Sequence, residues 1–334
     1  MPTTDRLVQD GTRRYGRFAV RPASVNPLDE FGGVARAARR WRLKEWVGFT
    51  LTNPDWYSSL IMQDAQYVAS SELYAYDRRR GALHQRAATK RGGSLGLPAD
   101  FDGRCVFRRR GYALEYELGG PDGRHRLRFD IAATDTTPAF EGELHLDGPH
   151  ASPPLSVSSR VPGGVLYTTK AIFPCEGTLR VGDDEIAFDG GRDLAILDEH
   201  KSFLPYRTTW LWGTFALRVD GGLAGANFVQ RATTPGHEDE SCIWTPDACE
   251  PLADVRFERD PTAPLSSWRI ASNDGRLDVT FDPEGRKTVK HQFGVASIDY
   301  VQLFGHYRGT VRGADRAYDV DGVHGVCESM RARL

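Results

Sequence analysis

Strand-like patterns dominate the chain, and in places hydrophobic and polar residues alternate as they do in β-strands. The segments predicted as strands are rich in aromatic and β-branched residues and are bounded by short turn sequences. In the first half they are 43–52, 56–63, 66–77, 103–109, 112–119 and 123–132. The only helix predicted in this half is short and covers 33–41.

Proline and glycine are concentrated between about 147 and 164, which we interpret as the connection between two halves. Glycine-containing turn sequences recur beyond this point. The strands predicted there are 176–181, 184–188, 193–200, 206–219, 222–230, 267–273, 276–282, 295–312 and 316–327. Roughly 16 to 18 strands suit two antiparallel barrels of about eight strands each. We therefore predict an all-β protein with little helix and two domains, residues 1–155 and 156–334.

The charge and composition limit which partners and which cellular compartment the protein is expected to have. Lys and Arg number 43 and Asp and Glu 45, so no overall field favours nucleic acid or an anionic membrane. The chain has no apolar run long enough for a membrane-spanning helix. The first sixteen residues lack the apolar core of a signal peptide, so a cytoplasmic protein is expected. Five scattered cysteines suit a reducing compartment, and none of their spacings predicts a metal site.

One stretch, DEHKSFLPYRTTWLWGTF at 198–215, places charged residues directly before aromatic ones. Because alternate residues of a strand share a face, Asp198 and His200 lie together, with Glu199 and Lys201 on the other side. An aspartate in this position can fix the tautomer of the imidazole or raise its pKa. In a desolvated pocket the aspartate can instead serve as a proton donor. The alternative is a surface salt-bridge cluster at the end of a strand.

The residues that follow form a face of rings and hydrogen-bonding groups. Tyr206, Thr208, Trp210 and Trp212 share one side of the predicted strand. Flat rings with hydroxyl and indole donors between them suit a cavity that holds an apolar ligand in one orientation. The alternative is that the two tryptophans belong to an ordinary barrel core or to a seam between barrels.

Four segments carry a resemblance to a known family. They are 42–68, 167–214, 225–230 and 320–334, with Lys170 before Pro174 and the sequence PYRT before the paired tryptophans. In these segments, and from about residue 20 to the end, the chain resembles the bacterial domain-of-unknown-function family 2804. This resemblance implies the architecture of carotenoid 1,2-hydratases, kievitone hydratase and fungal lipocalin-like cyclases, which is two lipocalin-like barrels in tandem.

The same resemblance implies a pocket for hydrophobic molecules, often terpenoid or polyketide-like, but no particular reaction. Many members have Asp-Trp-Gly where this chain has Asp198, Glu199 and His200, so only Asp198 carries over from the family. Asn227 and Gln230 are placed by the resemblance beside the tryptophan strand, where they either contact a ligand or satisfy backbone groups. Fold likeness alone is weak support for a function.

Two more residues are candidates for the lining of a pocket. Trp244 is one of them. The other, His306, shares a face with Tyr300 and Gln302, whereas Leu303 and Tyr307 on the opposite face are the more obvious core residues. His306 would be a second titrating group if its face points inward.

Three functions remain open, from different classes. The first is a cofactor-independent hydratase, lyase, isomerase or cyclase that acts by acid–base chemistry on a terpenoid, polyketide or lipid-like molecule. Protonating an alkene leaves a cation that indole rings stabilise. The second is a non-catalytic carrier or sensor for a hydrophobic ligand, and the third is a structural or partner-binding protein. The sequence leaves the oligomeric state open.

For the enzyme hypothesis we assign roles to individual residues. Asp198 is the general acid and His200 tunes it or accepts a proton. Lys201 and Lys170 supply positive charge, and Tyr206 positions the substrate or transfers a proton. The residues expected to bind the ligand are Trp210, Trp212, Thr208, Asn227, Gln230, Trp244 and His306.

Overall fold

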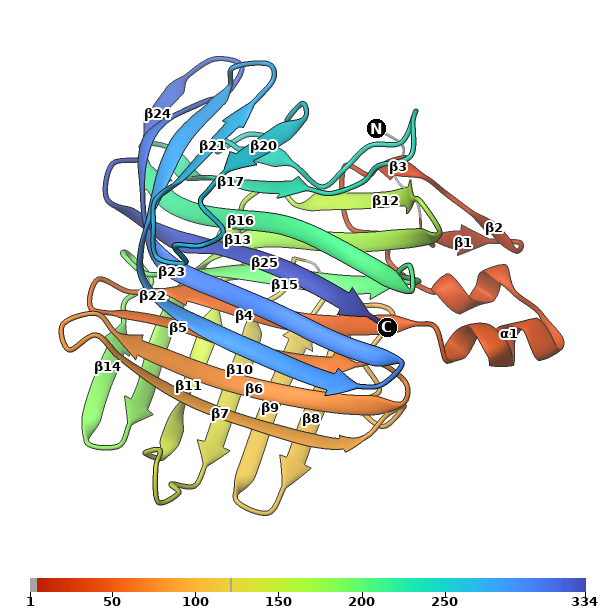
Figure 1. The fold of residues 1–334 in the computed structure, drawn as a ribbon, viewed down its shortest axis with the longest axis horizontal. Helices are drawn as coiled ribbons and strands as arrows, with labels where there is room; N and C mark the ends of the chain where they lie inside the picture. The colour runs from red at the N-terminus through yellow and green to blue at the C-terminus, as the bar shows by residue number, and fades with distance from the viewer. Residues whose placement is uncertain (1–4, 121) are drawn as a thin grey trace. The chain divides into compact units, whose positions relative to one another are not determined.

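The structure is a computed structural model that describes residues 5–120 and 122–334. The chain forms two compact units (Figure 1). Unit 1 contains the chain up to Ser158 together with Leu166–Phe203, and unit 2 contains Ser159–Val165 and Leu204–Leu334. Pro121, between the predicted strands 112–119 and 123–132, and the first four residues of the chain lie outside the described residues.

Unit 1 is built on a thirteen-stranded antiparallel sheet in the order β7-β6-β5-β4-β15-β13-β11-β10-β9-β8, with β3, β12 and β14 paired beside this path. The division into units cuts through β12 and β13: residues 159–165, which include the end of β12 and the start of β13, are assigned to unit 2. The long strands are β4 Lys44–Thr52, β5 Trp56–Asp64, β6 Val68–Asp77, β7 Ala82–Arg91, β8 Asp102–Arg109, β9 Tyr112–Gly119, β10 His125–Ile131, β11 Phe140–Leu146, β12 Leu155–Val161, β13 Gly164–Val181, β14 Asp184–Phe188 and β15 Leu194–Ser202.

Short elements complete unit 1. Three two-residue strands lie near the amino terminus, and β1 pairs with β2 in a sheet of its own. None of the helices in the described part of the chain is long and apolar enough to cross a membrane. The short elements are β1 Val8–Gln9, β2 Thr12–Arg13, β3 Gly16–Arg17, the 3-10 helices η1 Pro27–Glu30 and η2 Gly148–His150, and the α-helix α1 Gly33–Arg40.

Unit 2 is a ten-stranded antiparallel sheet in the order β19-β18-β17-β16-β25-β23-β22-β21-β20, with β24 paired to β23. Both large sheets curl into barrel-like bodies, so the predicted all-β fold of two lipocalin-like barrels with little helix is confirmed. The strands are β16 Arg207–Val219, β17 Gly222–Gln230, β18 Cys242–Trp244, β19 Cys249–Pro251, β20 Val255–Glu258, β21 Trp268–Ser272, β22 Leu277–Phe293, β23 Ala296–Arg312, β24 Ala317–Asp319 and β25 Val323–Arg333.

The alternation in the sequence explains how each sheet forms its core. In β4 the residues Val47, Phe49 and Leu51 are buried in the hydrophobic core of unit 1, and in β15 Ala195 and Leu197 join them. The residues between them point to the opposite face of the sheet. Each unit has its own core, because a second cluster in unit 2 contains Phe215, Phe228, Tyr307 and their neighbours.

The local structure differs from the sequence predictions in several places. The segment 147–164, interpreted above as the connection between two halves, contains strand β12, which pairs with β13 and β3. Its proline and glycine residues flank the strand rather than replace it. The strands predicted at 176–181 and 276–282 are parts of the longer strands β13 and β22. The strand predicted over 316–327 is two strands, β24 and β25, because Gly322 turns the chain with a φ of 77°.

Candidate functional site

Strand β15 lies in the middle of the unit 1 sheet, between β4 and β13. The register places Asp198 opposite Lys170 of β13, and His200 opposite Trp46 of β4. Residues at paired positions of neighbouring strands have their side chains on the same face of the sheet. Four side chains from three strands therefore gather around Asp198, and we call Trp46, Lys170, Asp198 and His200 the Asp198 cluster.

The carboxylate of Asp198 is the centre of this cluster. Lys170 Nζ donates a hydrogen bond to Asp198 Oδ1, and the Trp46 indole donates to Oδ2 at 3.0 Å. His200 Nε2 lies 3.3 Å from Asp198 Oδ1. The imidazole stacks on the Trp46 ring, with the ring centres 4.1 Å apart and the planes at 25°. The predicted pairing of Asp198 with His200 on one face is therefore correct, and Lys170 joins the pair.

The cluster is buried, which argues against the alternative of a surface salt-bridge cluster. Lys170 is 1 % exposed and His200 5 %, whereas the Asp198 side chain is 30 % exposed. Burial by itself raises the pKa of Asp198, but the charges of Lys170 and His200 outweigh it and hold the pKa below the ordinary value. Asp198 is consequently a carboxylate at neutral pH.

This ionisation changes the role that we assign to Asp198. A general acid must carry a proton near the working pH, and a carboxyl group with a lowered pKa does not. The prediction that Asp198 is the proton donor is therefore not supported by its surroundings. Its geometry suits a second role, in which a carboxylate holds an imidazole in one orientation and stabilises its protonated form.

The alternate residues of β15 face the core of unit 1 and form separate ion pairs. Arg21 donates two hydrogen bonds of 2.7 Å to the two carboxylate oxygens of Glu199. Lys201 Nζ donates to Glu45 Oε1 at 3.0 Å and to the Leu97 carbonyl at 2.9 Å. Lys201 is thus held on the opposite face of the strand from Asp198, and it does not join the Asp198 cluster.

In unit 2, strand β16 carries the tryptophans on the side away from the core. Phe215, Leu303 and Cys327 belong to the core of unit 2, so the alternate residues of β16, β23 and β25 face the other way. Trp210 Nε1 and the Tyr300 hydroxyl each donate to Glu328 at 2.7 Å. The tryptophans are therefore not part of the barrel core.

Trp212 is fixed by a chain of hydrogen bonds on the same side. Its indole donates to Asn227 Oδ1 at 2.8 Å, and Asn227 Nδ2 donates to the Glu240 carbonyl at 2.8 Å. Asn227 is fully buried. We call Trp210, Trp212, Asn227, Tyr300 and Glu328 the indole face.

The other predicted ligand-binding residues of unit 2 have different surroundings. Thr208 lies on the same strand as the tryptophans and is buried. Gln230 accepts a hydrogen bond of 2.8 Å from the Phe257 backbone, which joins β17 to β20. Trp244 is fully buried in β18. Tyr206 is half exposed and its hydroxyl donates to the Val295 carbonyl.

His306 has acidic neighbours, and its strand shows the predicted two faces. Its Nδ1 lies 3.1 Å from Glu284 Oε1, and its Nε2 lies 3.7 Å from Asp282 Oδ2. On the opposite face of β23, Leu303 and Tyr307 lie in the core of unit 2, as predicted.

Three residues of these sites were missed from the sequence. Trp46 and Glu328 hold the central groups of the Asp198 cluster and the indole face, and Arg21 neutralises Glu199. Each is far from its partner along the chain, so only the strand register reveals the contact. The signal available in the sequence was the family resemblance, because Trp46 lies in segment 42–68 and Glu328 in segment 320–334.

The chain belongs to the family described as "Domain of unknown function (DUF2804)", whose sequence profile matches residues 4–334. The predicted family is therefore confirmed. No curated protein matches the sequence.

Solved structures that align with a TM-score above 0.5 share the fold. The crystal structure of CghA with Sch210972 is 10 % identical in sequence, has a TM-score of 0.55, and aligns over 87 % of this chain and 88 % of that chain. A protein assigned as ATTH from Nitrosomonas europaea is 13 % identical, with a TM-score of 0.56 over 95 % and 99 % of the two chains. Kievitone hydratase from Nectria haematococca is 10 % identical, with a TM-score of 0.49 over 87 % and 88 %.

Proposed function

We propose that the protein is a cofactor-independent enzyme that moves protons on a hydrophobic small molecule, with His200 as the acid–base group. The observation that carries the proposal is the buried pair of Asp198 and His200, stacked against Trp46 and neutralised by Lys170. An imidazole can both give and take a proton, which suits it to acid–base catalysis.

Each member of the Asp198 cluster has a physical role in this chemistry. The Asp198 carboxylate orients the ring of His200 and stabilises its protonated form. Lys170 keeps that carboxylate ionised, and the Trp46 indole fixes its second oxygen. The flat face of Trp46 also stabilises positive charge nearby, whether on His200 or on a substrate cation. The reaction class that follows is hydration, dehydration, isomerisation or cyclisation.

The substrate we propose is apolar, of the terpenoid, polyketide or lipid-like class. Each unit supplies aromatic surface beside polar groups. In unit 1 the Trp46 ring lies beside Asp198, and in unit 2 Trp210 and Trp212 lie beside Glu328 and Asn227. Such a combination is typical of pockets for apolar molecules. CghA, which shares the fold, was solved with Sch210972. For Thr208, Asn227 and Trp212 we keep the predicted role in ligand binding.

Other predicted roles are revised by the contacts described above. Lys201 stabilises unit 1 through Glu45, and Tyr206 positions the segment around Val295. The setting that we propose is the bacterial cytoplasm, a reducing compartment that suits the five scattered cysteines.

A second candidate function is a carrier or sensor that binds a hydrophobic ligand without changing it. It is favoured by the hydrogen bonds within the Asp198 cluster, because a carboxylate held by Lys170 and Trp46 also serves as a purely structural ion pair. The two functions differ in what happens to a ligand once it is bound.

The test has two steps. A screen of terpenoids, fatty acids and steroids by thermal shift identifies ligands, because a molecule that binds only the folded state raises the Tm. Each hit is then incubated with the wild type and with His200→Gln, and the products are analysed by mass spectrometry. Loss of general acid–base catalysis should lower turnover by about 10² or more while the thermal shift persists. Ligands that bind and remain unchanged with the wild type would identify a carrier.

A further inference from the structure

Helix α1 is exposed on all sides. None of its residues is buried, and Trp41 continues the helical backbone directly after Arg40. Val34 is 87 % exposed and Trp41 63 %, at a spacing of seven residues that places them on one side of the helix. An amphipathic helix of a globular protein normally covers its apolar side against the core. This helix leaves that side open.

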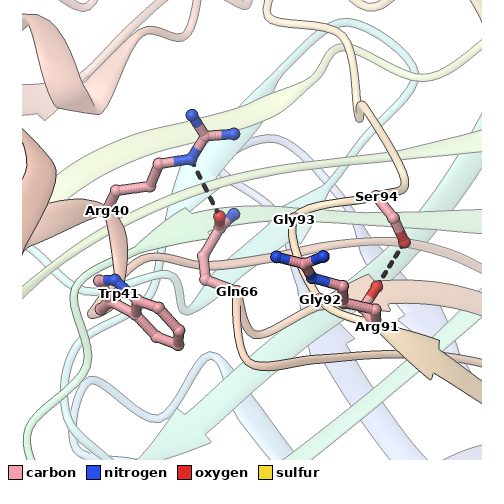
Figure 2. A pocket seen from close by; sticks show the side chains of 7 residues that line it. All are labelled: Arg40, Trp41, Gln66, Arg91, Gly92, Gly93 and Ser94. Atoms are coloured by element: carbon pink, nitrogen blue, oxygen red, sulfur yellow. Dashed lines mark hydrogen bonds between the residues drawn. The ribbon is translucent and has the colours of Figure 1, made fainter.

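A pocket of about 410 Å³ lies beside the end of α1 and is rich in positive charge. Figure 2 shows the Arg40 guanidinium above the Gln66 side chain, the Arg91 guanidinium to the right of Gln66 and the Trp41 ring to its left. Arg40 Nε donates to Gln66 Oε1 at 3.3 Å. The pocket is lined by Arg40, Trp41, Gln66, Arg91, Gly92, Gly93 and Ser94.

The two arginines of this pocket differ from most surface arginines of unit 1. Among residues 5–120 and 122–334, no carboxylate forms an ion pair with Arg40 or Arg91. Elsewhere in unit 1, Arg79 pairs with Asp55, and other exposed arginines pair with glutamates in the same way. The Asp64 carboxylate accepts hydrogen bonds from the backbone of Gln66, Gly93 and Ser94, so it is held by the loop and not by either arginine. Two guanidinium groups that line one pocket and form no ion pair attract an oxyanion, for which the guanidinium fork is well shaped.

Further apolar groups surround the pocket. Tyr67, 45 % exposed, lies on the turn between β5 and β6, and Val68 beside it is also exposed. This turn packs against the loop after β7, because a Cβ at Gly92 would lie within 2.5 Å of the backbone of Gln66 and Val68. The exposed apolar groups and the pocket lined by Arg40 and Arg91 thus lie on one surface. We call Val34, Arg40, Trp41, Tyr67, Val68 and Arg91 the α1 surface.

We propose that the α1 surface docks on an anionic lipid bilayer, with a headgroup phosphate held between Arg40 and Arg91. Tryptophan and tyrosine favour the boundary between headgroups and acyl chains, and basic residues are attracted by anionic lipids. A basic helix with a tryptophan on its apolar side is typical of binding in the plane of a membrane surface. A soluble phosphate ester offers the same oxyanion, but it leaves the exposed side of Val34 and Trp41 uncovered.

The net charge of −2 does not oppose this docking. Attraction to a charged surface acts over about 10 Å at moderate salt, so the local charge of the α1 surface decides it. The inference is independent of the chemistry proposed for His200, because it uses none of the residues of the Asp198 cluster.

The test is sedimentation with vesicles of phosphatidylcholine alone and of phosphatidylcholine mixed with an equal amount of phosphatidylglycerol. The wild type should bind the mixed vesicles, bind the neutral ones weakly, and dissociate as salt is added. The double variant Arg40→Gln/Arg91→Gln should bind the mixed vesicles about tenfold more weakly or worse. The control Arg79→Gln/Arg128→Gln removes the same charge from exposed positions of unit 1 and should bind like the wild type.

A second readout uses Trp41 directly. Its fluorescence should move to shorter wavelength on mixed vesicles, and Trp41→Phe should lose that part of the shift. Equal binding by the two double variants, or no preference for the anionic vesicles, would overturn the proposal. A third outcome would also overturn it. If inorganic pyrophosphate binds the wild type but not Arg40→Gln/Arg91→Gln, and vesicles do not bind, the pocket serves a soluble phosphate ligand.

Discussion

At the scale of single residues, the function of Asp198 is decided by what surrounds its carboxylate. Burial opposes its charge, yet Lys170 and His200 together keep its pKa below the ordinary value. A carboxylate of this kind cannot donate a proton, but it orients the histidine beside it. The same contacts tie three strands of unit 1 together, so the proposed catalysis and the stability of unit 1 would depend on the same side chains.

The Lys170–Asp198 pair should contribute to stability in a way that a double-mutant cycle reveals. Asp198→Asn leaves the buried ammonium group of Lys170 without this carboxylate, which should cost about 3 kcal/mol of unfolding free energy. Lys170→Met/Asp198→Asn removes both charges and should recover most of that loss. Urea unfolding measures both values. If Asp198→Asn unfolds at the same urea concentration as the wild type, the pair does not stabilise unit 1.

His125 should make the stability of unit 1 depend on pH. It is buried between Phe101 and Phe173, accepts a hydrogen bond from the Gly119 backbone, and burial lowers its pKa to about 4. In the unfolded chain the pKa returns to about 6.5. As the pH falls, the unfolded state therefore binds the proton before the folded state does. The contribution of neutral His125 to the unfolding free energy is present above about pH 6.5 and is lost as the pH falls through 4.

The measurement for His125 is a comparison of two pH profiles. Between pH 7 and 4 the wild type should lose roughly 3 kcal/mol more unfolding free energy than His125→Gln. The glutamine oxygen can still accept the hydrogen bond from Gly119. Carboxylates contribute equally to both proteins and cancel in the difference, so parallel profiles would show that His125 does not titrate in this range.

At the scale of elements, the alternation of side chains along a strand places core-facing residues on one face and candidate-site residues on the other. On β15 the core side carries Glu199 with Arg21, and the other side carries Asp198 with His200. On β16 the core side carries Phe215, and the other side carries the tryptophans of the indole face. The sequence alone predicted both separations, because they depend only on the twofold period of a strand.

Gly213 should be required for the close packing of β16 against the core of unit 2. A Cβ there would meet Phe228 Cε2 at 2.5 Å, the Tyr307 hydroxyl at 2.8 Å and the Val326 carbonyl at 3.0 Å. Gly213→Ala should therefore lower the unfolding free energy by about 2 kcal/mol. Thr209→Ala, at an exposed position of the same strand, is the control and should change it by less than about 0.5 kcal/mol. Equal stability of the two variants would mean that the core rearranges freely around the extra methyl group.

At the scale of the whole molecule, the sequence predicted the fold class better than it predicted the site. Strands rich in aromatic and β-branched residues, such as β4 and β16, were found within a residue or two. Strand β7 was missed because its sequence, ALHQRAATKR, is polar and basic and has no alternating apolar positions. The contact of Trp46 with Asp198 spans 152 residues and depends on the register of β4 with β15, which no local pattern encodes.

The central claim is that His200, held by Asp198, transfers protons to a bound hydrophobic molecule. Its most direct test is deuterium incorporation into a ligand from the thermal-shift screen, measured by mass spectrometry after incubation in D₂O. We predict that the wild type introduces deuterium into carbon positions of at least one ligand, and that His200→Gln binds the same ligand without labelling it. A ligand that binds the wild type and gains no deuterium, or one that His200→Gln labels at the wild-type rate, would contradict the account.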